Sequence, residues 1–198
     1  MISRTTSLRM YRLAFLFLLS ALATAGCRDA SSTGEAVSEA GYELVTVDAA
    51  SFAEDVGNID ADIRIINIWA TWCGPCHIEM PEFIRFGKDM ADQGVAVRFL
   101  SVDDARVLPQ VEQFVAEYGI TGPTYFSATG DLLIRNIHPR WQYGLPTTLM
   151  IDREMKIRDT WEGAVNYDFL LAKVERMRGI LTEESGSADS AETRSTES

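Results

Sequence analysis

Hydrophobic residues along the chain follow two spacings, and each spacing predicts a different kind of element. Residues 43–47 alternate between apolar and polar side chains, as a short strand does, and 51–56 has the spacing of a weak helix. The run 63–69 is β-branched and apolar almost throughout, which is typical of a central parallel strand buried on both faces. A helix is expected over 75–92 and a second buried strand over 95–102.

The second half of the chain keeps this alternation at first and then departs from it. The expected elements are, in order, a helix over 107–118 that Gly119 ends, a short strand near 124–126, a turn at 129–131, strands at 147–151 and 156–161, and a last helix from 166 or 168 to 181. Alternation early and a hairpin late predict an α/β fold, in which a central mixed β-sheet is flanked by helices on both faces.

The chain begins with the pattern of a secretory signal peptide. Arg4, Arg9 and Arg12 precede an apolar run over 13–22, and small residues follow as far as Gly26. The apolar run is shorter than the roughly 20 residues that a membrane-spanning helix needs. Residues 1–26 are therefore predicted to be a signal peptide, with an uncleaved membrane anchor as the alternative.

Cys27 follows the predicted cleavage site, and the run Ala25-Gly26-Cys27 resembles a bacterial lipobox. In signals of that family the cysteine becomes the lipidated first residue, although Thr24 stands here where a leucine is more usual. The chain has three cysteines, and a Cys-x-x-Cys pair leaves Cys27 over. We therefore expect Cys27 to carry the lipid that anchors the protein to a membrane; the alternative is an ordinary signal peptide with a cysteine nearby.

Composition divides the rest of the chain into three parts. Residues 27–41 and 182–198 are polar, with hardly an apolar side chain in the second, which predicts a flexible tether and a disordered acidic tail. Residues 42–181 suit one domain with a single core. Removing the signal peptide takes the net charge from −11 to −14, a balance that disfavours nucleic acid as a partner.

The turn Cys73-Gly74-Pro75-Cys76 carries the candidate chemistry because of its position. Cys73 follows a buried strand and begins a helix, where unpaired N–H groups and the helix dipole stabilise a thiolate. A thiolate is the attacking species in disulfide exchange. Cys76 lies one turn further on and is placed to resolve the mixed disulfide, while Gly74 and Pro75 permit the tight entry into the helix.

This part of the chain resembles the thioredoxin superfamily, and within it the exported TlpA/ResA-like branch. The residues that carry the resemblance are the run 67–76, then 79–81, 101–103, 144–148 and 151–152, which together span most of the core. The resemblance implies a thioredoxin-like fold and a redox-active disulfide between Cys73 and Cys76, with Cys73 as nucleophile and Cys76 as resolving cysteine.

The same resemblance implies roles for further residues. Pro146 is expected to be a cis-proline beside the two cysteines, which exposes the backbone of Leu145 to an extended substrate; the alternative is a trans proline that opens a strand. Trp72, Gly74 and Pro75 are expected to complete this substrate-binding surface.

Two polar positions of the resemblance concern protons. Glu79 stands where the branch has an acidic residue, one turn beyond Cys76, and is expected to manage the protons of the thiols; the alternative is a solvated carboxylate on a helix face. Asn67 stands where cytosolic thioredoxin has a buried aspartate. The reduction potential of cytosolic thioredoxin is therefore not assumed for this chain.

The same residues also fit other chemistries. Cys73-Gly74-Pro75-Cys76-His77 also fits a c-type haem attachment site, with His77 as axial ligand. Zinc binding lacks a fourth ligand, so no metal and no cofactor are expected. Peroxide-reducing relatives have a threonine three residues before their reactive cysteine, and Ala70 stands there instead. A non-redox chaperone or peptide-binding module is a further alternative, in which His138, Trp141, Gln142 and Tyr143 line a partner surface or pack onto the fold.

The resemblance finally implies partners and a location. We expect a lipid-anchored protein on the periplasmic side of a bacterial membrane, which reduces disulfides of exported proteins, such as apocytochrome c during cytochrome c maturation. Since that compartment is kept oxidising, steady reduction requires electrons from a membrane donor of the DsbD or CcdA kind. The direction of electron flow stays open.

Overall fold

The computed structural model describes residues 41–139, 141 and 144–196. The predicted signal peptide, the predicted lipidation site Cys27 and most of the tether lie outside the described residues, as do Gln142 and Tyr143. Among the helices of the described residues, none combines the length and the apolar character needed to cross a bilayer.

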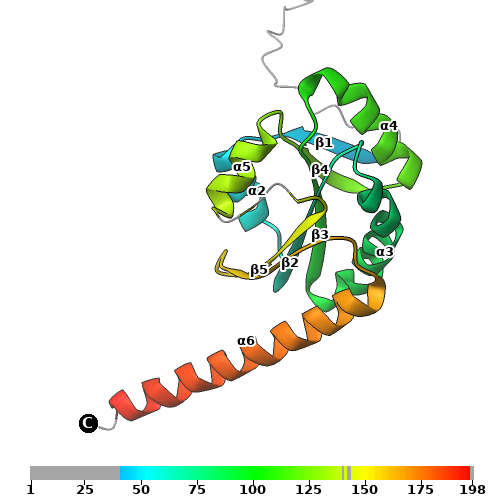
Figure 1. Cartoon of the computed structure of the whole chain (residues 1–198). Helices are drawn as coiled ribbons and strands as arrows, with labels where there is room; N and C mark the ends of the chain where they lie inside the picture. The colour runs from blue at the N-terminus through cyan, green and yellow to red at the C-terminus, as the bar shows by residue number, and fades with distance from the viewer. Residues whose placement is uncertain (1–40, 140, 142–143, 197–198) are drawn as a thin grey trace, which may run out of the picture. The chain divides into compact units, whose positions relative to one another are not determined.

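Six strands form one sheet in the order β1-β4-β3-β2-β5-β6 (Figure 1). The strands are β1 (Tyr42–Thr46), β2 (Ile63–Trp69), β3 (Val95–Ser101), β4 (Gly122–Phe126), β5 (Thr147–Asp152) and β6 (Ile157–Glu162). β1 to β4 run parallel to one another, whereas β5 and β6 pair antiparallel as a hairpin against β2. The expected mixed sheet is thus confirmed, with β2 near its centre.

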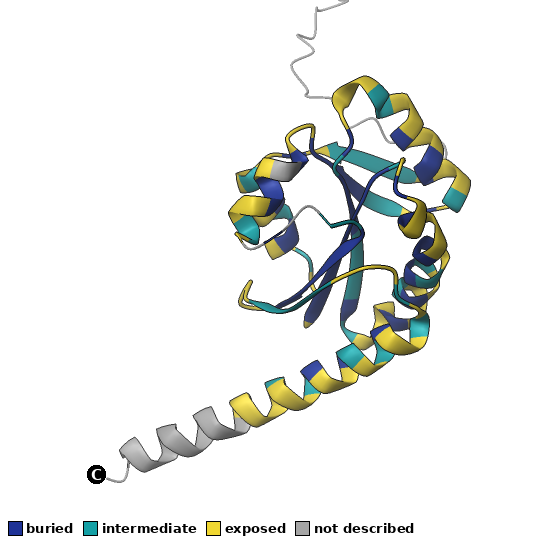
Figure 2. Ribbon diagram, viewed as in Figure 1, coloured by how far each residue is buried: buried dark blue, intermediate teal, exposed yellow. Residues whose placement is uncertain are grey.

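Helices cover both faces of the sheet (Figure 1). They are α2 (Ala49–Gly57), α3 (Gly74–Met90), α4 (Leu108–Tyr118), α5 (Gly130–Ile137) and α6 (Tyr167–Thr196), with short 3₁₀ turns η1 (Ala91–Gln93) and η2 (Ala105–Val107). α3, α4 and the first half of α6 share one hydrophobic core with the sheet, and α2 and α5 share the other. β2 is buried throughout because its side chains alternate between these two cores (Figure 2).

The ends of the helices follow from local sequence. Asp48 caps α2, since its carboxylate accepts hydrogen bonds from the N–H groups of Ala50 and Ser51, both at 2.9 Å. Gly119 ends α4 as expected, with the positive φ of 64° that a glycine adopts without strain. Cys73 begins α3, which places the candidate chemistry at the junction between β2 and that helix.

The structure differs from the sequence-based expectation in two segments. Residues 130–137, which follow the expected turn, form α5, because Leu133 and Ile134 are buried on the sheet. Residues 182–196, expected to be a disordered tail, continue α6. An ion pair supports its continuation, since Glu184 pairs with Arg158 of β6 at 2.7 Å.

Candidate active site

Cys73 and Cys76 are joined by a disulfide at the first turn of α3. The Cys73 sulfur also accepts a hydrogen bond from the N–H of Cys76 at 3.2 Å, as the side chain of a helix N-cap does. Cys73 retains 4% of its surface exposed, whereas Cys76 is fully buried. An incoming sulfur therefore meets Cys73 first, and Cys76 lies behind it. This is the order expected of a nucleophile and a resolving cysteine.

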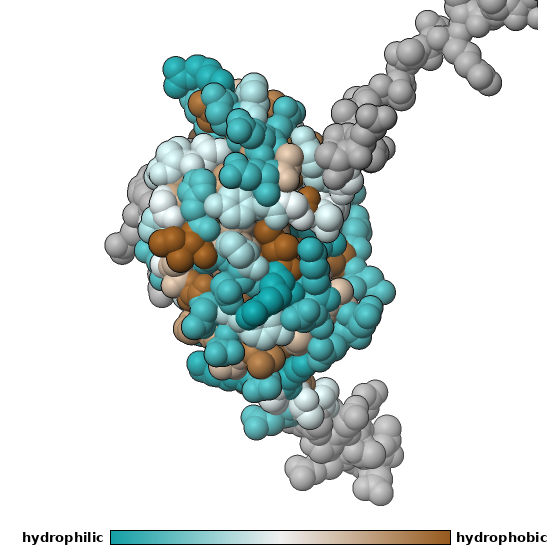
Figure 3. Space-filling model, turned by 90° about the vertical axis from the view of Figure 1, so that its right-hand side faces the viewer, coloured by the Kyte–Doolittle hydropathy of each residue, from teal (hydrophilic) through white to brown (hydrophobic). Residues whose placement is uncertain are grey.

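The surface around the disulfide is open and partly apolar. Gly74 and Pro75 are exposed, and Trp72 keeps 71% of its surface exposed beside Cys73. On the face seen in Figure 3, hydrophobic patches are interrupted by hydrophilic side chains. Leaving a large apolar side chain such as Trp72 in water is costly, so its exposure beside Cys73 is consistent with a surface that contacts a partner.

The loop before β5 lies at the same end of the sheet as the disulfide. The Leu145–Pro146 peptide bond is cis, and Thr147, the next residue, pairs with Ile68 of β2. Pro146 is buried and its carbonyl accepts the N–H of Gly163 at 2.8 Å. The structure thus places Pro146 at the carboxyl end of β2, where the chain turns toward the cysteines.

The buried side chain of Trp141 holds this loop in place by hydrogen bonds. Its indole N–H lies 3.2 Å from the Gly144 carbonyl and 3.0 Å from the Thr147 hydroxyl, which itself donates to Gly144 at 2.6 Å. Trp141 is 6% exposed. Of the two interpretations open for this residue, the geometry favours packing onto the fold.

Glu79 is buried beneath the turn and is not a solvated carboxylate. Only 1% of its surface is exposed. One carboxylate oxygen accepts the side-chain amide of Asn67 at 2.6 Å, and the other accepts the N–H of Val165 at 3.0 Å. Burial raises the pKa of Glu79 from 4.5 to about 7, although the two hydrogen bonds oppose the change. Near neutral pH Glu79 is therefore present in both its protonated and its charged form, and it lies one turn after Cys76.

Asn67 connects this carboxyl group to the sheet. Its amide nitrogen also lies 3.3 Å from the Thr148 hydroxyl on β5, while its amide oxygen is buried without a partner. Asn67 is neutral at every pH, so Glu79 is the ionisable group of this contact. Asn67, which stands where cytosolic thioredoxin has an aspartate, thus donates a hydrogen bond to Glu79.

Asp103 binds the turn before the cysteines, a contact that sequence reasoning missed. It follows β3 and is 1% exposed; its carboxylate accepts the N–H of Thr71 at 2.9 Å and the Thr71 hydroxyl at 2.7 Å. The Ser101 hydroxyl donates to the same carboxylate at 3.0 Å. The sequence did carry one indication of this contact, since Asp103 directly follows the predicted buried strand over 95–102.

His77 packs against α4 and the turn. Its ring nitrogens lie 2.9 Å from the Tyr118 hydroxyl and 2.9 Å from the Thr71 carbonyl, and its ring meets Phe114 edge-on. Haem attachment requires two thiols free for thioether bonds and a histidine nitrogen free for iron. Here the cysteines bond to each other and both ring nitrogens of His77 are engaged, so this geometry does not fit the haem alternative.

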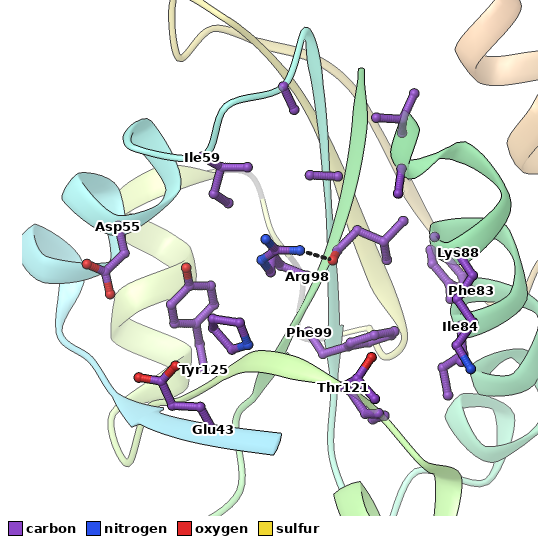
Figure 4. Close-up of a pocket in the computed structure, with 18 of the residues that line it drawn as sticks. Glu43, Asp55, Ile59, Phe83, Ile84, Lys88, Arg98, Phe99, Thr121 and Tyr125 are labelled. Atoms are coloured by element: carbon purple, nitrogen blue, oxygen red, sulfur yellow. Dashed lines mark hydrogen bonds between the residues drawn. The ribbon is translucent and has the colours of Figure 1, made fainter. Parts of the chain in front are cut away.

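Metal ligation finds no support in the described residues, where no group of three or more His, Cys, Asp or Glu side chains is arranged to hold an ion. A cavity of about 880 Å³ is lined mainly by residues of β3, β4, α3 and the loop before β2. Its lining includes Ala61 before β2 and Val95 at the start of β3, and Arg98 donates to the Val97 carbonyl at 2.9 Å in its wall (Figure 4). No predicted site residue lines it, so the cavity is separate from the candidate active site.

Known proteins resemble this chain over its core. The model of the AhpC/TSA family matches residues 45–160. "Thiol-disulfide oxidoreductase ResA" of Oceanobacillus iheyensis is 32% identical over 107 residues, which are 54% of this chain and 52% of that protein. "Thiol-disulfide oxidoreductase ResA" of Geobacillus kaustophilus is 24% identical over 147 residues, 74% of this chain and 80% of that protein. In the alignment with the Oceanobacillus protein, the chain spans about half the relative's length.

Among solved structures, a putative thiol:disulfide interchange protein DsbE from Chlorobium tepidum superposes with a TM-score of 0.50 and 20% identity. The superposition covers 64% of this chain and 83% of that protein. At this identity the likeness concerns the fold, and it confirms the expected thioredoxin-like arrangement of sheet and helices.

Proposed function

Because this chain belongs to the AhpC/TSA family, we propose that it is a thiol–disulfide oxidoreductase that exchanges the Cys73–Cys76 disulfide with cysteine pairs of other proteins. One observation carries the proposal. The pair lies at the start of α3, with Cys73 4% exposed and Cys76 fully buried, one helical turn before a carboxyl group of raised pKa. The names of the relatives support the same chemistry.

In the reductive direction, exchange proceeds in two displacements. The Cys73 thiolate attacks one sulfur of a substrate disulfide, which forms a mixed disulfide and releases the other substrate sulfur as a thiolate. Cys76 then attacks Cys73, which forms the intramolecular disulfide and releases the second substrate thiolate. Two electrons pass from the protein to the substrate, and the reverse order oxidises a dithiol.

Glu79 moves the proton that this sequence requires. Cys76 is fully buried, so its thiol has no direct access to bulk water when it must ionise. A carboxylate with a pKa of about 7, one turn away, accepts that proton at neutral pH. The protonated carboxyl then returns it to a leaving thiolate or to solvent. Glu79 is thus proposed as the general base of the second displacement.

The substrate is proposed to lie in extended form across the disulfide. Trp72, Gly74 and Pro75 border Cys73, and the backbone of Leu145 before Pro146 offers hydrogen-bonding groups to a peptide. A surface built from backbone and one indole tolerates varied sequences. This favours a general class of substrate, namely exported proteins with accessible disulfides.

We further propose that the protein works outside the cytoplasm, held at the membrane by a lipid on Cys27. The basic and apolar pattern over residues 1–26 supports export, and the lipobox-like run before Cys27 supports the anchor. In an oxidising compartment Cys73 and Cys76 need a membrane donor of the DsbD or CcdA kind to be reduced again. Apocytochrome c is one proposed substrate.

Trapping of mixed disulfides tests the proposed exchange. Cys76→Ser leaves Cys73 without its resolving partner, so Cys73 should stay bonded to its substrates, and non-reducing electrophoresis should show heavier species that dithiothreitol removes. Cys73→Ser is the matched control and should trap none. A chaperone without redox turnover predicts full function for both variants, and absence of adducts in Cys76→Ser would contradict the exchange mechanism.

A further inference from the structure

The His77 side chain is fixed at three points although the residue is exposed. Ring nitrogen Nε2 lies 2.9 Å from the Thr71 carbonyl oxygen, and Nδ1 lies 2.9 Å from the Tyr118 hydroxyl. The ring also meets Phe114 at a centroid distance of 4.8 Å. We propose that His77 is a positioning residue that holds the turn from Thr71 to Cys73 in its reactive geometry, an inference that rests on the proposed exchange function.

Thr71 is the residue through which His77 acts. Its N–H and hydroxyl both donate to Asp103, at 2.9 and 2.7 Å. Its carbonyl accepts from His77, so every polar group of Thr71 is bound. Thr71 is thus bound on one side by Asp103, which follows β3, and on the other by His77 of α3. Because Thr71 lies two residues before Cys73, fixing its peptide groups fixes the approach of the chain to the reactive sulfur.

Hydrogen-bond chemistry decides which nitrogen of His77 carries the proton. A carbonyl oxygen only accepts, so Nε2 must be the donor to Thr71. In the neutral ring Nδ1 is then an acceptor, and the Tyr118 hydroxyl donates to it. In the charged ring Nδ1 donates to Tyr118, whose proton turns to the His77 carbonyl at 3.5 Å. Both charge states preserve the bond to Thr71.

The consequence for Cys73 follows from its place at the helix N-terminus. Its sulfur lies 3.2 Å from the Cys76 N–H, and its own N–H donates to the Ala70 carbonyl at 3.0 Å. Thiolate stabilisation by helix N–H groups falls off within the first turn. Without His77 the peptide after Thr71 can rotate, which moves the sulfur away from those groups. A smaller thiolate fraction and a looser turn should result.

A pair of amide variants isolates the bond to Thr71. The side-chain nitrogen of His77→Gln reaches about as far as Nε2 and can donate to the carbonyl, whereas that of His77→Asn reaches only as far as Nδ1. The rate of iodoacetamide alkylation of reduced Cys73 at pH 7, followed by mass spectrometry, reports its thiolate fraction. We expect His77→Asn to react about threefold to tenfold more slowly, the value of one lost hydrogen bond, and His77→Gln to stay within about twofold of wild type.

Gln113→Asn is the matched control, because Gln113 is exposed on α4. Changing glutamine to asparagine there costs about the same helix stability as the difference between the two His77 variants. It should leave the rate unchanged. Hydrogen exchange of the Cys73 amide should accelerate in His77→Asn alone. The proposal is overturned if His77→Asn reacts like Gln113→Asn, or if His77→Gln is as slow as His77→Asn. Alkylation requires no substrate, so failure to trap substrates with Cys76→Ser would contradict the proposed function while leaving this result readable.

Discussion

Replacing Glu79 with Gln should stabilise the oxidised protein at alkaline pH and leave its stability nearly unchanged in acid. The carboxyl group is 1% exposed and its pKa is raised to about 7 by burial. Glutamine fills the same volume without charge. It can also keep both contacts, because the Asn67 amide oxygen has no partner at present and can accept from the glutamine amide after the asparagine side chain turns over.

The magnitude follows from the two pKa values of Glu79. The folded protein retains a proton that the unfolded chain releases between pH 4.5 and about 7. Wild-type stability contributed by this group therefore falls as pH rises through that window and levels off above pH 7. The interval from 4.5 to about 7, at 1.36 kcal/mol per pH unit, corresponds to about 3 kcal/mol. Glu79→Gln should recover most of it.

Urea denaturation of the oxidised wild type and Glu79→Gln at pH 4 and pH 8 measures the effect. The two curves should nearly coincide at pH 4, and the variant should gain about 2–3 kcal/mol at pH 8. Glu112→Gln, at an exposed carboxylate on α4, provides the comparison and should gain no stability at pH 8. Equal pH dependence in wild type and Glu79→Gln would refute the claim that Glu79 ionises within the fold at a raised pKa.

Two further residues lead to separate predictions. Arg64 is 3% exposed and its guanidinium donates to the carbonyls of Ile59 and Asp152 at 2.8 and 2.6 Å, so Arg64→Met should cost about 2–3 kcal/mol in urea denaturation, with Arg64→Lys intermediate. Trp141→Phe removes the N–H that holds Gly144; KM for a peptide disulfide should rise about threefold to tenfold while the rate with a small disulfide stays constant, and equal losses on both substrates would count against a role in peptide binding.

Hydrophobic periodicity predicted most of the fold because most helices and strands bury apolar residues at regular spacing. β2 is apolar at nearly every position and lies at the centre of the sheet, as its composition indicated. α5 escaped the same reasoning, since its eight residues bury only a narrow stripe and begin at a glycine that suggested a turn. The helix over 182–196 escaped because its first turn is held by the ion pair of Glu184 with Arg158 on β6, a contact that the local sequence does not indicate.

The candidate site was accessible from sequence only where residues adjoin in the chain. Cys73 and Cys76 form one turn, and their relation could be predicted from spacing. The bonds of Asp103 to Thr71 and of Tyr118 to His77, on either side of that turn, depend on how β3 and α4 pack against α3, which no local pattern encodes. The burial of Glu79 likewise depends on Val165, 86 positions away, whose N–H reaches its carboxylate.

In the proposed mechanism, Glu79 with its partner Asn67 takes the place of the buried aspartate of cytosolic thioredoxin, from which this chain departs at position 67. An asparagine on β2 cannot take a proton, but here its amide donates to Glu79 at 2.6 Å, so the ionisable group has moved from the sheet to α3. A second carboxylate beside Glu79 would couple their titrations and hold one of them neutral. A single carboxyl group with a pKa of about 7 instead takes up and releases one proton near neutral pH. In the proposed exchange this group accepts the proton of Cys76, which is fully buried and has no direct access to water.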